Sequence, residues 1–116
     1  MKYRLTDETK EWCGHMLHKI EYTEEWLKEQ DLDELEGGWI ESEKNLSQDG
    51  NARVYGDAWV YGEARVYGDA LVYGEARVSQ GRTTSMRIST TEQWYEYQYR
   101  KAELQKKWDK ESKDED

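Results

Sequence analysis

The sequence predicts a mainly β protein. A short solenoid of parallel strands carries a β-hairpin and an acidic helix before it and an α-helix after it. Three observations predict this fold. A six-residue motif repeats from Ala52 to Val78, two β-prone runs flank Cys13 and Gly14, and apolar residues recur at helical spacing after Ser89. A chain of 116 residues is expected to form one domain with appendages.

The repeat reads Ala-x-Val-Tyr-Gly-acid, where x is Arg, Trp or Leu. Side chains alternate between the two sides of a strand, so the Ala and Val of each unit share one side and x points the other way. The glycine allows a sharp corner after each strand. Strands this short cannot build long hairpin ladders, whereas a solenoid pairs each of them with the coils above and below. The expected outward residues are Arg53, Trp59, Arg65, Leu71 and Arg77.

This spacing is similar to that of hexapeptide-repeat proteins. In that family an aliphatic residue recurs at every sixth position with a small residue four places after it, as Val54 and Ala58 do here. The resemblance implies a short left-handed parallel β-helix with three repeat units in each triangular coil. Equivalent positions would then be stacked at strand spacing, about 4.8 Å apart.

The register extends beyond the clean repeat in both directions. Ile40 and Leu46 keep the six-residue spacing, whereas Arg82 stands where Ala is expected and the pattern then decays into one irregular strand. The expected segments are a β-hairpin over 1–22, an acidic helical segment over 23–36, the repeat over 37–88, a helix over 89–113 and a tail over 114–116.

Two helices are expected outside the repeat. Thr23 is the expected cap of the acidic helix, which Gly37 stops, and Ser89 with Glu92 forms a candidate capping box for the last helix. An aromatic stripe on the last helix is expected to pack either back on the solenoid or against another copy of the chain. The stripe consists of Trp94, Tyr97, Leu104 and Trp108.

The net charge of −9 is concentrated in one part of the chain. From Glu21 to Glu43 there are ten acidic residues against Lys28 alone. This disfavours direct nucleic-acid binding, which needs cations against phosphates, and favours a host protein with a basic surface. A solvated helix that keeps the chain soluble is the alternative. The acids expected to meet the partner are Glu24, Glu25, Glu29, Asp31, Asp33, Glu34 and Glu36.

The core of the repeat is small in a chain that is 37% charged and has no Phe. The inward Val side chains are too few to offset the conformational entropy of the coils, so terminal segments or sister subunits are expected to cap them. We therefore expect a homo-oligomer, a dimer or the trimer that the family resemblance favours. Trp59 and Leu71 are expected in that contact or beneath a terminal segment.

The chain offers little for catalysis. Its two histidines, His15 and His18, lie in the expected hairpin, whereas resemblance to the acyltransferases of the hexapeptide-repeat family would require a histidine base beside the coils. Cys13 and the two histidines are spaced tightly for zinc, and a turn cysteine with two strand histidines is the ordinary interpretation. We expect no enzyme activity, no cofactor and no metal.

The expected location is the cytoplasm of a bacterial host cell. The single cysteine cannot form an intramolecular disulfide, which favours a reducing compartment. We expect neither a membrane-spanning segment nor a signal peptide.

The residues before the repeat resemble the front part of small hexapeptide-repeat proteins that are common in bacteriophage and prophage genomes. The resemblance covers about residues 2–80, and Arg4, Trp12, Cys13 and the segment 23–36 depart from it. It implies a phage context and no particular reaction. The matching residues are Tyr3, Leu5, Thr6, Asp7, Leu17, His18, Ile20 and 37–41.

These observations lead to three hypotheses. The first is a non-catalytic phage or mobile-element binding protein that inhibits a host nucleic-acid-handling or defence complex through its acidic surface, as an anti-CRISPR protein would. The second is a structural module, either a trimeric assembly or a virion-associated part. The third, a hexapeptide-repeat acyltransferase, is disfavoured by the position of both histidines.

Overall fold

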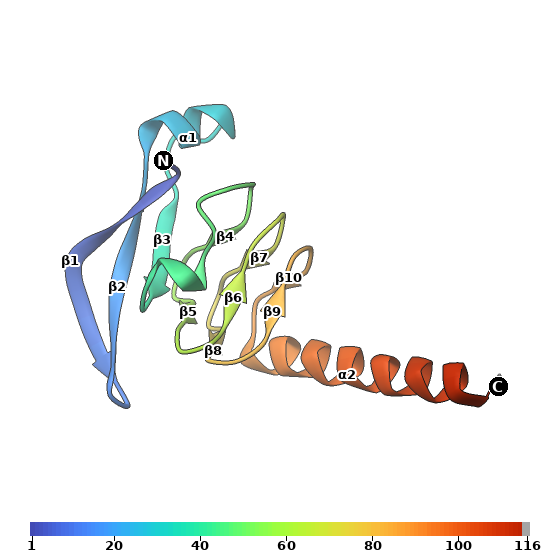
Figure 1. Ribbon diagram of the computed structural model, residues 1–116. Helices are drawn as coiled ribbons and strands as arrows, with labels where there is room; N and C mark the ends of the chain where they lie inside the picture. Colours follow the sequence, from blue (N-terminus) through green and yellow to red (C-terminus); the bar gives the residue numbers. More distant parts are fainter. Residues whose placement is uncertain (115–116) are drawn as a thin grey trace.

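The computed structural model describes the backbone of residues 1–114 and the side chains of residues 1–103. Figure 1 shows a stack of short strands with a long hairpin at one end and a long helix at the other. The elements are β1 (Tyr3–Trp12), β2 (His15–Tyr22), α1 (Glu24–Glu29), β3 (Glu36–Ile40), a 3₁₀ turn (Glu43–Asn45), β4 (Arg53–Val54), β5 (Trp59–Val60), β6 (Arg65–Val66), β7 (Leu71–Val72), β8 (Arg77–Val78), β9 (Arg82–Thr83), β10 (Arg87–Ile88) and α2 (Thr91–Asp114).

The repeat forms a solenoid of short parallel strands. Its strands fall into three sheets, with orders β1-β2-β3-β5-β8, β10-β7-β4 and β6-β9. In the clean repeat, Arg53 pairs with Leu71 and Trp59 with Arg77, so one coil takes eighteen residues (71 − 53 and 77 − 59). This confirms the predicted pairing with the coils above and below. Every Ala and Val predicted to point inward is buried.

The corners between strands depend on glycine in the left-handed region of the backbone. Gly68 has φ +65°, and a Cβ there would lie 2.6 Å from the carbonyl oxygen of Thr84 in the next coil. Both the backbone conformation and the close approach of the coils therefore require glycine at this corner.

The register of the last coil differs from the prediction. Arg82 does not take the inward place of Ala: it pairs with Arg65 on the outer side, while buried Thr83 lies below Val66. The last coil is shorter than the clean repeat: Arg82 follows Arg65 by seventeen residues (82 − 65), and Arg87 follows Leu71 by sixteen (87 − 71). The first missing residue shifts the alternation by one at Arg82, which the six-residue count could not detect.

The predicted hairpin is present as an antiparallel pair of β1 and β2. Its turn places Cys13 at φ 47° and Gly14 at φ 83°, the two positive values that a tight hairpin turn requires. β1 is interrupted by a bulge between Leu5 and Thr9, and β2 continues the sheet by pairing with β3. The hairpin is therefore part of the first face of the solenoid.

The acidic helix is shorter than predicted. Thr23 caps it as expected, because its hydroxyl oxygen accepts a hydrogen bond from the Trp26 amide at 3.3 Å. The helix ends at Glu29, and Asp31 follows with φ 59°. The prediction that it continues to Gly37 was wrong, because this left-handed residue already ends it and the chain enters β3 at Glu36.

The last helix begins at Thr91, two residues after the predicted start at Ser89. The hydroxyl oxygen of Thr90 accepts a hydrogen bond from the Gln93 amide at 3.1 Å, and Oε1 of Gln93 accepts one from the Ser89 amide at 2.8 Å. The prediction that Ser89 and Glu92 form the capping box was therefore wrong, because Thr90 caps the helix. Figure 1 shows α2 starting against the last coil and then extending beyond it.

No helix in the described part of the chain is both long and apolar enough to cross a membrane.

Candidate binding surfaces

The predicted acidic surface lies on α1, on the irregular segment after it and on the first residue of β3. All seven predicted side chains are exposed. Glu36 pairs with Lys19, whose Nζ lies 3.2 Å from the carboxylate. Within the described residues the other six form no ion pair, so their charge is left uncompensated. These six are Glu24, Glu25, Glu29, Asp31, Asp33 and Glu34.

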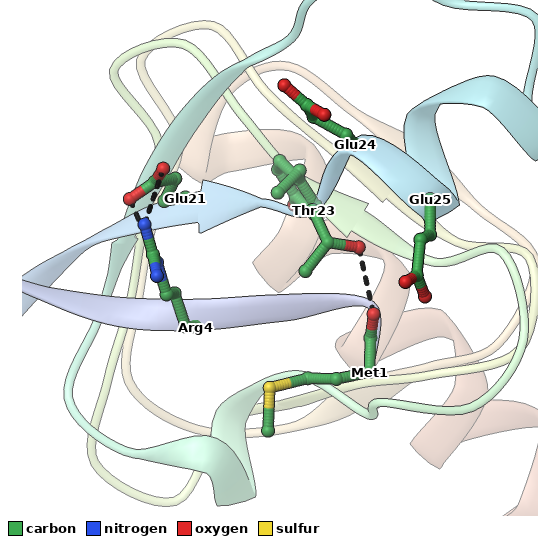
Figure 2. A pocket seen from close by; sticks show the side chains of 7 residues that line it. Met1, Arg4, Glu21, Thr23, Glu24 and Glu25 are labelled. Atoms are coloured by element: carbon green, nitrogen blue, oxygen red, sulfur yellow. Dashed lines mark hydrogen bonds and ion pairs between the residues drawn. The ribbon is translucent and has the colours of Figure 1, made fainter.

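A cavity of about 510 Å³ opens beside this surface, between the start of the chain and α1. Figure 2 shows that Arg4 is held by Glu21, whereas Glu24 and Glu25 stand free of that pair. Arg4 donates two hydrogen bonds to Glu21, at 3.0 and 2.9 Å, and these bonds keep the pKa of the Glu21 carboxyl below its ordinary value. Arg4, the cation that lines this cavity, is therefore already paired.

The acidic surface rests on an aromatic and polar cap that covers the first edge of the solenoid. The buried hydroxyl of Tyr22 donates to the carbonyl of Val54 at 2.8 Å and accepts from the amide of the same residue at 2.9 Å. Its ring stacks on Trp26 of α1, with centroids 5.0 Å apart. Nζ of Lys2 donates to the Ala52 carbonyl at 2.6 Å. These contacts fix α1 to the coil.

Burial changes the ionisation of two groups in this cap. It lowers the pKa of Lys2 to about 8, an effect that nearby Arg53 strengthens and Asp49 opposes. It also raises the pKa of Tyr22, so the phenol stays protonated and can act as donor and acceptor together.

Trp59 lies beneath the N-terminal hairpin, one of the two places predicted for it. Nζ of Lys10 lies 4.0 Å from the ring centre of Trp39 and 5.0 Å from that of Trp59, and the Arg77 guanidinium lies 4.1 Å from the ring centre of Trp59. The ring of Trp12 meets Trp59 edge to face at 5.6 Å. This cation–π stack attaches the hairpin tip to the solenoid.

The remaining predicted contact residues are spread over other faces. Leu71 is half-buried between Arg53 and Arg87 in register. Trp94 is fully buried against the last coil and donates from Nε1 to the Gln80 carbonyl at 2.6 Å, and Tyr97 is half-buried. The side chains of Leu104 and Trp108 lie outside the described part. The large apolar side chains that are exposed are Met1, Trp12, Met16, Tyr95 and Tyr99.

The two histidines do not converge on one site. Nδ1 of His15 lies 2.9 Å from Oε2 of Glu41, and the amide of Gly62 donates to the other oxygen of that carboxylate at 2.9 Å. Burial opposes ionisation of Glu41, but these two hydrogen bonds outweigh it and lower its pKa. His18 lies three residues along β2, on the opposite side, with Nδ1 3.3 Å from the Thr6 carbonyl.

No cluster of three metal-ligating side chains is found among the described residues. The hydrogen bond of His15 joins the hairpin to the residue that follows β3, whereas that of His18 lies within the hairpin, between β2 and β1.

Comparison with known proteins found a family model that matches the repeat. Residues 50–62 and 64–80 match the family model described as the YdcK beta solenoid repeat. This match and the stacked parallel strands together assign the segment to the β-solenoid repeats. Neither the curated proteins nor the solved structures include one that matches the chain significantly.

Proposed function

We propose that the chain is a non-catalytic binding protein that presents its acidic end to a basic surface of a host protein. The observation that carries this proposal is the set of six exposed carboxylates that form no ion pair within the described residues. Concentrated charge of one sign steers a protein of opposite charge into contact and selects against wrong partners. The cap beneath α1 supports this role because it holds the helix that carries the glutamates in one orientation.

The context we propose is a bacteriophage or other mobile element acting in the bacterial cytoplasm. The resemblance of the residues before the repeat supports it, and the same resemblance supports a left-handed coil. A protein that handles nucleic acid has a basic groove, so an acidic surface that occupies the groove would inhibit it. The specific form of the proposal is an inhibitor of a host defence complex, comparable to an anti-CRISPR protein.

The test uses the tagged full chain as bait in host lysate at low salt, with mass spectrometry of the captured proteins. The test variant neutralises four acids: Glu24→Gln, Glu25→Gln, Glu29→Gln and Asp31→Asn. The matched control neutralises four exposed acids at the solenoid corners: Asp57→Asn, Glu63→Gln, Asp69→Asn and Glu75→Gln.

We expect the control to retain the captured protein and the test variant to lose it. Capture should also weaken steeply with salt, because screening shortens the reach of exposed charges. Equal capture by the two variants would contradict the proposal.

A structural trimer is the second candidate, and exposed Tyr95 and Tyr99 on α2 favour it as a surface that copies could share. Sedimentation of the purified chain tests it: loss of the trimer on replacing both tyrosines with Ser would support it, and a monomer would exclude it. Acyl transfer requires acetyl-CoA binding, and a calorimetric titration without heat would dismiss it.

A further inference from the structure

A basic groove lies at the other end of the molecule, between the outer side of β6 and β9 and the first turns of α2. Its volume is about 520 Å³. Arg65, Arg82 and Lys101 line it, and Glu63 is the single acid among its lining residues. The groove is therefore positive in a chain whose net charge is −9.

The two arginines are stacked in register. Arg65 pairs with Arg82 across the parallel bridge between β6 and β9, and both side chains are exposed. Neither forms an ion pair within the described residues. Like charges directly opposite on a sheet are unfavourable. An anionic group between them would remove this repulsion.

The second wall of the groove is held in place by α2. Nε2 of Gln98 donates to the Arg82 carbonyl at 2.8 Å, and its side chain lies against Gly81, where a Cβ would approach the Gln98 side chain to 2.6 Å. Lys101 follows three residues later on the same helix and also lines the groove.

We propose that this groove binds the acidic segment, residues 23–36, of a second copy of the chain. The six uncompensated carboxylates of that segment are the complement of the three cations. Figure 1 shows α1 and α2 on opposite sides of the solenoid, so the two surfaces of one chain do not meet. The contact is head to tail, and it repeats into open chains or closes into a ring.

A copy of the chain fits the groove better than a nucleic acid does. A nucleic acid would place many phosphates near a chain whose net charge is −9, and the acidic end of the molecule would repel them. A head-to-tail contact instead places each acidic end against a basic groove and neutralises both. The contact between copies depends on the groove and does not require a host protein, although the contact with a host protein would use the same carboxylates.

The experiment measures sedimentation velocity of the purified full chain over a concentration series at low and high salt. The groove variant carries Arg65→Gln and Arg82→Gln, and the acid variant carries Glu24→Gln, Glu25→Gln and Glu29→Gln. Self-association of the wild type should decrease with salt, and each variant should weaken it by roughly tenfold. All substituted side chains are exposed, and circular dichroism checks that the variants fold.

Mixing the two variants gives the sharper result. The groove variant keeps an acidic end and the acid variant keeps a basic groove, so the mixture can form one intact contact. We expect a 1:1 heterodimer that does not grow further. The control variant, Lys44→Gln with Arg87→Gln, removes two exposed cations outside the acidic segment and the groove, changes the net charge as the groove variant does and should still self-associate.

Several results would overturn the proposal. One is a wild type that stays monomeric at low salt, and another is a mixture of the two variants that forms no heterodimer. Association that neither variant weakens would place the contact elsewhere. A labelled oligonucleotide that binds the wild type and not the groove variant would show that the occupant is a nucleic acid.

Discussion

The hydroxyl of Tyr22 completes the first edge of the solenoid, and its removal is the most direct test of the N-terminal cap. The single oxygen serves both the amide and the carbonyl of Val54, which is fully buried. In Tyr22→Phe the ring can stay on Trp26, but both backbone groups lose their partner. A buried unsatisfied group costs about 1–3 kcal/mol, so we expect a loss of about 2–4 kcal/mol.

The matched control is Tyr95→Phe at the opposite end. The Tyr95 hydroxyl accepts a hydrogen bond from the Ser79 amide at 3.0 Å, but this side chain is 39% exposed. Water can replace the lost hydroxyl there, so the expected loss is below about 1 kcal/mol. The two variants remove the same atom and differ in burial.

Urea unfolding followed by tryptophan fluorescence measures both variants. The midpoint of Tyr22→Phe should fall by about 1–2 M at an unchanged slope, and that of Tyr95→Phe by less than half as much. Hydrogen exchange at the Val54 amide provides a local readout, because this amide should lose protection in Tyr22→Phe alone. Equal losses for the two variants, or an unchanged Val54 amide, would refute the account of the cap.

Three further predictions concern ionisation and close packing. The folded-state pKa of Glu41 lies below its ordinary value of 4.5. The ionised carboxylate therefore stabilises the folded chain above pH 4.5, and this stabilisation is lost as the pH falls through the folded-state pKa. Acid unfolding of Glu41→Gln should lack this loss. Lys2 has a folded-state pKa of about 8 against an ordinary value of 10.5. Between these values the unfolded chain binds more protons than the folded chain, so the free energy of unfolding should rise with pH. In Lys2→Met this rise should disappear. Gly37→Ala places a Cβ 2.0 Å from a backbone oxygen of β2 and should cost more than about 3 kcal/mol in thermal unfolding, whereas Gly14→Ala, with open space and only an unfavourable φ, should cost about 1 kcal/mol. A Glu41→Gln titration that parallels the wild type, a persistent rise in Lys2→Met or equal costs for the two glycines would contradict these predictions.

The repeat could be predicted from the sequence because its period fixes both the inward side and the pairing partner. The Val and Ala positions needed no information beyond alternation and a corner glycine. The prediction was wrong where the period changes: Arg82 follows Arg65 by seventeen residues and not eighteen, which moves Arg82 from the expected inward place to the outer side. Such a shift in register becomes visible only in the pairing of β6 with β9.

The caps could not be predicted in the same way, because they depend on side chains far apart in the sequence. Nothing in the local pattern indicates that Tyr22 reaches Val54 or that Lys2 reaches Ala52. The acidic surface was visible in the sequence because charge needs no partner to be counted.

The two caps explain why the solenoid stops after so few coils. A stacked strand leaves an edge that a further coil could continue, and no feature of the repeat itself prevents this. At the last edge, the hydroxyl oxygens of Thr91 and Tyr95 accept hydrogen bonds from the amides of Arg77 and Ser79, at 2.8 and 3.0 Å, as a further strand would. The number of repeats therefore sets only the separation of the ends, about 4.8 Å for each coil. The acidic segment lies before the repeat, and the basic groove lies on β6, β9 and α2, so whole coils added between β3 and β6 would change the spacing of the two surfaces without changing either one.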